Sequence, residues 1–420
     1  MASNQKLIYV YDAFSFDKDV LLGTFYVDVV RGGESYSFEY DSEWLKKTKY
    51  SVSLDPDLGT YAGRQYSADR NMFGVFADAS PDRWGRILMN KRERITADKE
   101  LRKPRKLYDS DYLLGVYDET RMGGLRFKLD KDGPFLSDDK DDAVPPWATL
   151  RTLEEASRNY ENDETGLDER WLNQLIRPGS SLGGARPKAT VIDTNGQLWI
   201  AKFPSKNDDY DTGAWEKVVH DLAKMCGLNV PESRLERFSK YGSTFLVKRF
   251  DRDGQRRIHF ASAMTLLGKT DGAGAVDGTS YLDLVGFLKS YGVSPQDDML
   301  ELWKRIVFNM AVTSTDDHLR NHAFILCNGG WKLSPLYDVN PVPYGDELSL
   351  NVDENDNRID INLAIQVAPK YGVSEENAKD FAGVILSTVK DNWETLATRY
   401  GLSRGQIEAM RPAFSICYEI

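Results

Sequence analysis

Two stretches of the sequence hold side chains whose types and spacing suit phosphoryl transfer. The first contains Asp316 and Asn321 in Asp-x-x-x-x-Asn spacing, and the second reaches Asp338 after an apolar run at 323–326 and a turn signal at 328–330. In phosphoryl transfer from ATP, one carboxylate accepts the proton of the attacking hydroxyl, while an Asn and a second carboxylate hold magnesium against the phosphates. A polar loop that closes a helix would use the same residue types, so this pattern alone leaves both interpretations open.

The segments upstream predict elements that could position these groups. Two apolar runs joined by Asn195-Gly196 predict a hairpin, and Lys202 lies on its second strand. A lysine beside apolar neighbours needs an anionic partner, and Glu216, near the start of a predicted helix, could supply it. The helix dipole alone also favours a glutamate at that place, so a purely structural role stays open. An amphipathic helix at about 299–312 leads the chain into the Asp316 segment.

These pieces stand in the order that protein kinases use. A loop with Gly183 and Gly184 precedes the lysine strand, the glutamate helix follows, and the Asp316 segment and Asp338 come last. The Asp-to-Asn spacing is that of a kinase catalytic loop. Each piece alone is common in proteins, but their shared order and predicted secondary structure favour a kinase.

Composition limits the class of protein. The chain has 420 residues, 41% hydrophobic residues and a formal net charge of −11, which is typical of a globular protein of roughly two to three domains. The acidic balance argues against tight non-specific binding of nucleic acid by the whole chain. No apolar run approaches membrane-spanning length, no apolar signal-peptide core follows Met1, and the three cysteines fit reduced thiols. We therefore expect a cytoplasmic protein without membrane contact.

The first predicted domain, at 1–145, is β-rich. Strands are expected at 7–11, 22–28 and 35–40, from their alternating apolar residues. A helix is expected to begin at Ser80-Pro81, and its basic surface is better explained as a solvated face than as a partner-binding face. An acidic stretch that runs into a pair of prolines indicates a linker.

The later patterns predict a second domain at 146–255 and a third at 256–420. In the third, we expect a further hairpin from 348–352 and 359–363, and a long helix at 378–399. A Ser-x-x-Gln capping box at 403–406 predicts the start of another helix.

A set of short motifs is more specific than spacing alone. These motifs are Ser181-Leu182-Gly183-Gly184-Ala185-Arg186-Pro187-Lys188, Ile200-Ala201-Lys202-Phe203-Pro204, Leu228-Asn229-Val230-Pro231, Lys248-Arg249-Phe250-Asp251-Arg252, Thr315-Asp316-x-His318-x-x-Asn321 and Pro335-Leu336-Tyr337-Asp338. They resemble the HipA family, whose members are serine/threonine kinases that act as toxins in bacterial HipBA toxin–antitoxin pairs. The resemblance spans essentially the whole chain. It implies an α+β, two-lobed protein-kinase-like fold with a β-rich N-terminal subdomain, a kinase N-lobe and an all-helical C-terminal part.

The resemblance implies a role for each residue that matches a catalytic motif. Asp316 would be the catalytic base. Asn321 and Asp338 would be the magnesium ligands, so ATP and Mg²⁺ are the expected cofactors. His318 would order the catalytic loop.

The resemblance also implies a nucleotide site. Lys202 would contact the α- and β-phosphates and pair with Glu216. The other residues expected at ATP form the glycine-containing loop and the hinge that receives the adenine, and they are Ser181, Gly183, Gly184, Lys188, Lys248, Arg249 and Phe250. Ser181 would in addition be autophosphorylated, which would expel the loop and switch nucleotide binding off.

For partners, the resemblance implies a protein substrate whose phosphorylation arrests growth, the state called persistence. A translation factor such as an aminoacyl-tRNA synthetase is one candidate, and glutamyl-tRNA synthetase is one known kind of target in the family. A small HipB-like helix-turn-helix antitoxin would neutralise the chain. DNA would be contacted only indirectly, through that antitoxin.

The sequence departs from the family pattern at one place and from the pattern of ordinary protein kinases at another. Asp317 stands where the family often has Gly, and it would either add negative charge beside the magnesium site or face solvent. Asp338-Val339-Asn340 stands where ordinary protein kinases have Asp-Phe-Gly.

Two other classes of function compete with a kinase. Asp316, Asp317, His318 and His322 could form the metal site of a hydrolase, although this leaves Lys202 without a role. Alternatively, the chain could be a catalytically weak nucleotide-binding module that acts as a co-repressor with a DNA-binding antitoxin. The chain keeps Lys202, Asp316, Asn321 and Asp338, and this complete set argues against a protein that has lost catalytic activity.

Overall fold

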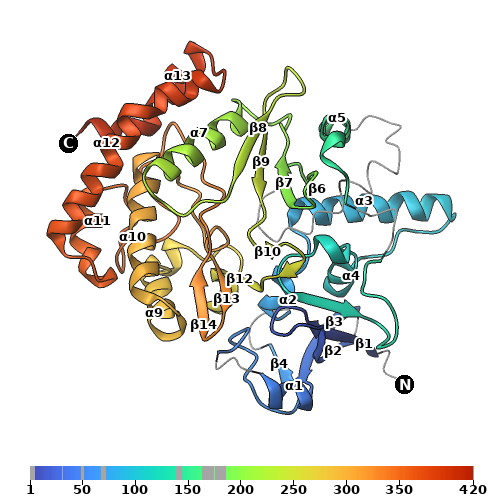
Figure 1. Ribbon diagram of the computed structural model, residues 1–420. Coiled ribbons are helices and arrows are strands. Elements are labelled where there is room, and N and C mark those ends of the chain that lie inside the picture. Colours follow the sequence, from blue (N-terminus) through green and yellow to red (C-terminus); the bar gives the residue numbers. More distant parts are fainter. Residues whose placement is uncertain are drawn as a thin grey trace. The chain divides into compact units, whose positions relative to one another are not determined.

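The computed structural model describes residues 5–30, 32–48, 52–67, 72–138, 144–162, 175 and 186–419. The chain forms two compact units that are interleaved along the sequence (Figure 1). Unit 1 consists of Met1–Lys206 and Arg249–Ala261, and unit 2 consists of Asn207–Lys248 and Ser262–Ile420. The three domain ranges predicted from the sequence stay a prediction.

A five-stranded antiparallel sheet forms the centre of unit 1, with strand order β4-β3-β2-β1-β5. Its strands are β1 (Gln5–Asp12), β2 (Val20–Val30), β3 (Gly33–Tyr40), β4 (Gln65–Tyr66) and β5 (Leu125–Lys128), which confirms the three strands expected near the N-terminus. Ile8, Phe25 and Phe38 lie opposite one another on neighbouring strands and are fully buried on one face. Phe76 of α2 (Gly74–Asp78) packs there, with its ring 4.7 Å from that of Phe25.

Unit 1 also contains helices and short strands outside this sheet. They are α1 (Ser42–Lys47), α3 (Arg83–Lys99), α4 (Asp109–Leu114), η1 (Asp118–Thr120), η3 (Trp147–Thr149), α5 (Leu150–Glu161), β6 (Lys188–Ile192), β7 (Leu198–Lys202), β10 (Arg252–Asp253) and β11 (Arg256–Arg257). Strand β12 (Phe260–Ser262) crosses the boundary between the units. β6 and β7 form the predicted hairpin, and Gly196 in its turn has a φ of 74°, which glycine adopts without strain.

Helix α3 begins at Arg83, so the start expected at Ser80-Pro81 is wrong. The N-cap is Asp82, whose Oδ1 accepts a hydrogen bond from the N–H of Gly85 at 2.8 Å. The hydroxyl of Ser80 instead donates to a carbonyl of the preceding helix. A carboxylate suits this place because it satisfies a free N–H and interacts favourably with the helix dipole.

A buried cluster of charges fixes the 249–257 segment in unit 1. Asp251 is fully buried, and its carboxylate accepts hydrogen bonds from Arg249, Arg252 and the N–H of Gly123, at 2.6, 2.7 and 2.8 Å. Burial alone would raise the pKa of Asp251, but the two guanidinium charges lower it well below its ordinary value. Because a buried carboxylate is tolerated only with such partners, this cluster ties the segment to the N-terminal part of the chain.

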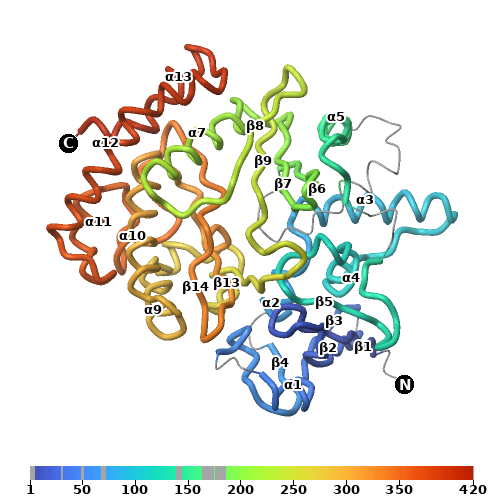
Figure 2. The backbone as a smooth tube through the Cα atoms, in the orientation of Figure 1, coloured from blue at the N-terminus to red at the C-terminus, as the bar shows by residue number. Residues whose placement is uncertain are grey.

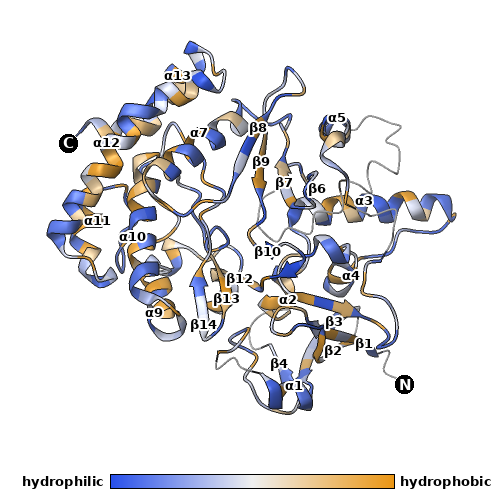
Figure 3. Cartoon of the chain, viewed as in Figure 1, coloured by the Kyte–Doolittle hydropathy of each residue, from blue (hydrophilic) through white to orange (hydrophobic). Residues whose placement is uncertain are grey.

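Unit 2 is mostly helical. Its elements are α7 (Thr212–Met225), β8 (Ser233–Glu236), β9 (Thr244–Lys248), α8 (Ala263–Leu266), η4 (Ala275–Asp277), α9 (Tyr281–Tyr291), α10 (Pro295–Ala311), β13 (Ala323–Cys327), β14 (Gly330–Leu333), α11 (Ile361–Val367), η5 (Ala368–Tyr371), α12 (Glu375–Arg399), α13 (Arg404–Met410) and η6 (Arg411–Tyr418). Helix α12 packs against α7 and α10, and η6 returns along α12 (Figure 2). Both hydrophobic and hydrophilic residues lie along α12 (Figure 3), and its buried Trp393 stacks on Phe414 at a ring distance of 4.4 Å. Among the described residues, no helix is long and apolar enough to cross a membrane.

Several predictions for unit 2 are confirmed and two are corrected. α10, α12 and the capping box at Ser403 are present as expected. The hairpin expected at 348–352 and 359–363 forms only in part. The two segments pair through one isolated antiparallel bridge, Glu347 with Arg358, and its neighbouring backbone hydrogen bonds. The chain then enters α11, where Asp360 accepts a capping hydrogen bond from the N–H of Asn362. The C-terminal part is also not all-helical, since β13 and β14 pair as a hairpin within it.

A substitution of Asp251 tests the charge cluster. We expect Asp251→Ala to lower the free energy of unfolding by about 3–5 kcal/mol, because it leaves two guanidinium groups buried without their anion. Asp253→Ala is the matched control, since Asp253 is exposed nearby and its loss should change stability by no more than about 0.5 kcal/mol. Urea unfolding followed by tryptophan fluorescence measures both variants, and equal losses would contradict the role of the cluster.

Candidate active site

Helix α10 leads directly into the loop that contains Asp316, and hydrogen bonds fix the path of the chain between them. Thr313, which follows the helix, has a φ of 47°, a backbone region that few residues other than glycine adopt. Its hydroxyl donates to the carbonyl of Ala413 at 2.8 Å, and the N–H of Ser314 donates to the carbonyl of Asn309 at 2.8 Å. A strained backbone of this kind persists only where its surroundings hold it.

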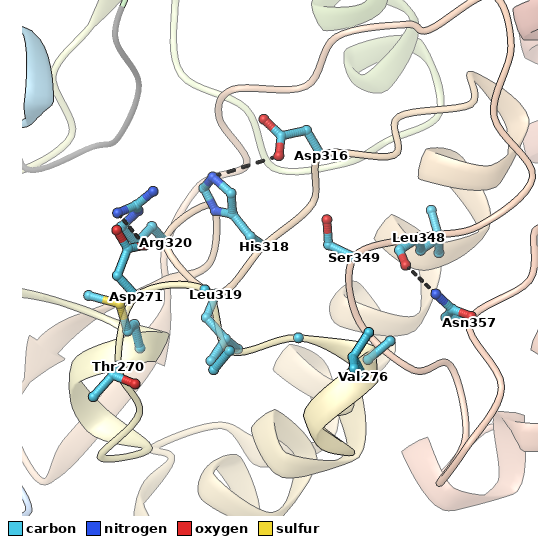
Figure 4. Close-up of a pocket in the computed structure, with 15 residues that line it drawn as sticks. Thr270, Asp271, Val276, Asp316, His318, Leu319, Arg320, Leu348, Ser349 and Asn357 are labelled. Atoms are coloured by element: carbon cyan, nitrogen blue, oxygen red, sulfur yellow. Dashed lines mark hydrogen bonds and ion pairs between the residues drawn. The ribbon is translucent and has the colours of Figure 1, made fainter. Parts of the chain in front are cut away.

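The structure brings Asp316, His318 and Asn321 together. Asn321 is buried, its Nδ2 donates to the backbone carbonyl of Asp316 at 2.7 Å, and its N–H donates to the carbonyl of His318 at 2.8 Å. The Asp316 side chain is 87% exposed, with Oδ1 4.0 Å from Nε2 of His318 (Figure 4). The loop therefore presents a carboxylate to solvent while an amide fixes the backbone beneath it.

The surroundings of Asp316 raise the pKa of its carboxyl group. Partial desolvation and the negative charges of Asp338 and Asp317 raise it, against the opposing effect of His318. Because most of the side chain is exposed to water, the two neighbouring carboxylates explain the direction better than burial does. A carboxylate with a raised pKa is a stronger base, which suits acceptance of a proton from a hydroxyl.

Asp317 is buried, so of the two alternatives for this residue, the one in which it faces solvent is wrong. Its carboxylate accepts hydrogen bonds from the hydroxyl of Tyr281 and from Nδ2 of Asn309, both at 2.6 Å, and its Oδ1 lies 3.0 Å from Nε2 of His322. Burial alone would raise the pKa of Asp317, but His322 and Tyr281 lower it below its ordinary value. The carboxylate is therefore held in its charged form.

The contact between Asp317 and His322 also closes the loop. Asp317 directly follows Asp316, and His322 directly follows Asn321. A contact between 317 and 322 therefore holds the two ends of the 316–321 segment together. The hydrogen bond from Asn321 to the Asp316 carbonyl closes the same segment a second time.

Asp338 adopts a left-handed backbone conformation at the end of a pinned segment. Its φ is 59°. The hydroxyl of Tyr337 donates to the carbonyl of Arg320 at 2.7 Å, and the N–H of Leu336 donates to the carbonyl of Asn229 at 2.8 Å. These contacts hold Asp338 next to the 316–321 loop, where its charge reaches Asp316. Unusual backbone geometry at a polar residue is common at functional sites.

Asn321 and Asp338 fit a magnesium ion. The Oδ1 atom of Asn321 is buried and has no hydrogen-bond partner within the part of the chain that the structure describes. A buried acceptor of this kind calls for a ligand that satisfies it. Mg²⁺ prefers oxygen donors and is commonly held by one or two protein side chains together with substrate phosphates.

The two predicted lysines lie opposite each other on the β6–β7 hairpin. Lys188 is buried, and its Nζ lies 2.8 Å from Oδ2 of Asp82, so it has an anionic partner inside unit 1. Its contact with ATP stays a prediction. Lys202 belongs to unit 1 and the buried Glu216 to unit 2, so their pairing also stays a prediction.

The predicted hinge residues lie at and just after the end of β9. Lys248 is the last residue of that strand, and Phe250 lies just beyond it. The guanidinium of Arg249 is 1% exposed and pairs with Asp251 at 2.6 Å, so its side chain serves the charge cluster and only its backbone could meet a nucleotide. Ser181, Gly183 and Gly184, with the modification predicted for Ser181, lie outside the described residues.

The metal site of a hydrolase does not form. Across the described ranges, no three His, Cys, Asp or Glu side chains lie close enough to hold a metal ion. Asp317 and His322 contact each other in the interior, whereas His318 lies beside the exposed Asp316. The four residues considered for the metal site of a hydrolase therefore form two separate pairs.

Sequence reasoning missed Tyr281 and Asn309, the buried donors to Asp317. Asn309 is fully buried inside the apolar end of α10, between Phe308 and Met310. A polar residue within such a run is a detectable signal, because a buried amide needs a partner. Tyr281, by contrast, carries no local signal for its role.

Two family models match the chain. Residues 180–393, just over half of the chain, match the HipA-like C-terminal domain, and residues 19–103 match the HipA N-terminal domain. The chain therefore belongs to the HipA family, which confirms the resemblance of its motifs.

Curated relatives carry kinase names. "Putative kinase Y4mE" of Sinorhizobium fredii is 27% identical over 247 residues, which cover 53% of this chain and 51% of the relative. A "Putative kinase" of Haemophilus influenzae is 28% identical over 186 residues, which cover 39% of this chain and 54% of the relative. The chain thus spans about half the length of the curated relatives it matches.

A solved structure shares the fold over nearly the whole chain. It is the toxin–antitoxin complex of HipA, HipB and operator DNA from Shewanella oneidensis MR-1, with a TM-score of 0.66 and 16% identity, covering 98% of this chain and 96% of that one. The predicted α+β, kinase-like HipA fold is thereby confirmed.

The neighbouring carboxylates Asp316 and Asp317 should differ sharply on substitution. We expect Asp317→Ala to lower the free energy of unfolding of unit 2 by about 3 kcal/mol or more, because it leaves Tyr281, Asn309 and His322 buried without their acceptor. Asp316→Ala is the matched control and should change stability by no more than about 0.5 kcal/mol, because its side chain is exposed. Thermal unfolding followed by circular dichroism compares them, and a stable Asp317→Ala protein would refute the proposed anchoring.

Proposed function

We propose that this HipA-family chain is an ATP-dependent serine/threonine protein kinase. One observation carries the proposal: Asn321 binds the backbone of Asp316 through its Nδ2, while its buried Oδ1 has no hydrogen-bond partner among the described residues. The loop thus offers an exposed carboxylate to an acceptor and a preoriented oxygen to a cation. The kinase names of the curated relatives support the same class of activity.

In the proposed reaction, Asp316 accepts the proton of a serine or threonine hydroxyl. The acceptor oxygen forms a bond to the γ-phosphorus of ATP while the bond from that phosphorus to the β,γ-bridging oxygen breaks, and ADP leaves with the electron pair. The raised pKa of Asp316 favours proton acceptance. His318, next to the carboxylate, is a positioning residue for it.

Asn321 and Asp338 would hold Mg²⁺, which when bound neutralises charge on the transferred phosphoryl group. The hydrogen bond from Nδ2 of Asn321 fixes the orientation of the amide and leaves Oδ1 for the cation. The left-handed backbone of Asp338 fixes the direction in which its carboxylate leaves the chain.

The nucleotide site is assigned from the family motifs. Lys202 would bind the α- and β-phosphates and pair with Glu216, and the backbone from Lys248 to Phe250 would receive the adenine. The loop with Gly183 and Gly184 would cover the phosphates, with Lys188 at its end. Phosphorylation of Ser181 by a second molecule would add about −1.5 to −2 charges to this loop and so expel it.

Partners and substrate are proposed on the same ground. A protein substrate, such as an aminoacyl-tRNA synthetase, would be phosphorylated to arrest growth in the cytoplasm. A HipB-like helix-turn-helix antitoxin would neutralise the chain and bring it to DNA. The complex from Shewanella oneidensis, which contains HipA, HipB and operator DNA, supports this pairing.

Variants of Asp316 and Asp338 separate proton acceptance from metal binding. We expect Asp316→Ala to slow phosphate transfer about 10²-fold or more and to leave Mg²⁺-dependent ATP affinity unchanged, because the base touches only the acceptor hydroxyl. Asp338→Ala should lower both the rate of phosphate transfer and the Mg²⁺-dependent affinity for ATP, because the proposed metal ligand is lost. Radiolabel transfer and calorimetric ATP titration, each with and without Mg²⁺, provide the two measurements.

Asp380→Ala is the matched control, since Asp380 is an exposed carboxylate of α12. If the Asp316→Ala variant transferred phosphate at the rate of the wild-type chain, Asp316 would not be the catalytic base. Magnesium-dependent ATP binding without any transfer by the wild-type chain would favour the non-catalytic nucleotide-binding module.

A double-mutant cycle tests the pairing of Lys202 with Glu216. If the two residues act as one unit, Lys202→Arg and Glu216→Ala should each lower transfer strongly, and the double variant should be little worse than either. The rate of radiolabel transfer measures all three variants. Additive losses would show that the residues act independently.

A further inference from the structure

A pocket of about 410 Å³ lies beside Asp316, within the usual size of ligand pockets, and all its lining residues belong to unit 2 (Figure 4). Asp316 and His318 line it on one side. The segment 270–276 forms a second wall, and Leu348, Ser349 and Asn357 form a third. The exposed carboxylate proposed as the base is therefore part of a ready-made cavity.

The lining places this pocket on the acceptor side of the base. Asp316 and His318 line the pocket, whereas Asn321 and Asp338, the proposed metal ligands, do not. In phosphoryl transfer the metal ligands face the nucleotide phosphates, and the base faces the attacking hydroxyl. A cavity that includes the base without the metal ligands is thus suited to the molecule that carries the hydroxyl.

Contacts within unit 2 hold the pocket walls in place. The N–H of Ala275 donates to the carbonyl of Ser349 at 2.8 Å, and Nδ2 of Asn351 donates to the carbonyl of Ala275 at 3.1 Å. A Cβ atom at Gly274 would lie 2.9 Å from the Ser349 carbonyl oxygen, so the close approach of the two walls requires glycine there. The pocket is therefore built before any acceptor arrives.

An ion pair ties the 270–276 wall to the catalytic loop. Nη1 of Arg320 lies 2.6 Å from Oδ1 of Asp271, and both residues line the pocket. Because these charges neutralise each other, Asp316 is the remaining carboxylate in the lining.

Of the other polar side chains in the lining, the hydroxyl of Ser349 donates to the carbonyl of Thr315 and Nδ2 of Asn357 donates to the carbonyl of Leu348, both at 2.8 Å. These donors are used within the chain, which leaves the apolar members of the lining for contact with a substrate.

The apolar lining indicates what the pocket accepts. Its members are Met264, Ala273, Ala275, Val276, Leu319 and Leu348. Leu319 and Leu348 are 2% exposed and form the floor of the cavity, whereas Val276 is fully exposed. The alanines leave room that larger residues would fill. Such a surface gains from covering an aliphatic side chain, since burial of apolar area is favourable.

We propose that this pocket binds the aliphatic residue that lies next to the phosphorylated serine or threonine in a protein substrate. The inference rests on the proposed kinase function and deepens it by naming the substrate class. With the aliphatic side chain in the pocket, the neighbouring hydroxyl lies beside the Asp316 carboxylate, which takes its proton. Substrates are selected by apolar contact beside the acceptor.

The test uses the whole chain, ATP, Mg²⁺ and a degenerate library of serine- and threonine-centred peptides. We expect the wild-type chain to favour Val, Leu, Ile or Met over Asp or Lys beside the acceptor by about tenfold or more, which is the scale of discrimination by an apolar pocket. Val276→Asp should raise the KM for the best aliphatic peptide by a similar factor of about tenfold, because the added carboxylate loses water when the peptide binds. The KM for ATP should stay the same.

Val384→Asp is the matched control, because Val384 is an exposed valine of α12 and does not line the pocket. It should leave both KM values unchanged. Ala273→Leu, which reduces the pocket volume without adding charge, should again raise the KM for the aliphatic peptide alone.

Two results would overturn the pocket assignment while leaving the kinase proposal intact. One is efficient phosphorylation of the library without preference for an aliphatic neighbour. The other is an unchanged peptide KM in Val276→Asp and Ala273→Leu. Absence of transfer to every peptide and protein would defeat the kinase proposal and the pocket assignment with it.

Discussion

The carboxylate of Asp317 is removed from water and held by donors from separate elements of unit 2. Tyr281 comes from α9, Asn309 from α10 and His322 from the chain just after the loop. Removing a carboxylate from water costs on the order of several kcal/mol, and only well-placed hydrogen-bond donors offset this cost. Because the donors to Asp317 have fixed positions, the loop can adopt few other conformations. The geometry of the candidate site depends on this anchor, because Asp316 and Asn321 are covalent neighbours of the anchored pair.

One short loop thereby separates two kinds of chemistry. Its first residue, Asp316, is exposed and borders an apolar pocket, whereas its last, Asn321, is buried and keeps an oxygen for a cation. A base needs access to the acceptor, and a metal ligand needs a fixed direction, so the opposite exposures of the two side chains suit their proposed roles. Because the buried contacts of Asp317 fix the backbone next to Asp316, the position of the exposed Asp316 carboxylate can be well defined although its side chain is not buried.

Features with a strong local signal could be predicted from the sequence. The β6–β7 hairpin followed from Asn195-Gly196, and the order of the kinase-type motifs indicated the fold that the HipA relatives confirm. The strand expected at 359–363 forms only in part: the chain pairs with the 346–348 segment around Arg358 and then continues as a helix, which the capping carboxylate of Asp360 begins. The surroundings of Asp317 could not be read either, because Tyr281 is far away in sequence and only the folded chain brings it to the loop. For the same reason, the glycine-containing 270–276 segment gave no sign that it would border the base.

The interleaved path of the chain has a consequence for how the protein is made. Unit 1 is completed by the 249–261 segment, which leaves the ribosome only after 207–248 of unit 2. Until then, the carbonyl of Thr120 and the N–H of Gly123 lack the native partners that Arg249 and Asp251 provide. All five strands of the N-terminal sheet lie before residue 129, so what stays unsatisfied during translation is the 120–123 segment next to β5, which is then open to early misassembly or to chaperones. The order of synthesis therefore leaves buried polar groups of unit 1 without partners in the nascent chain that they have in the finished protein.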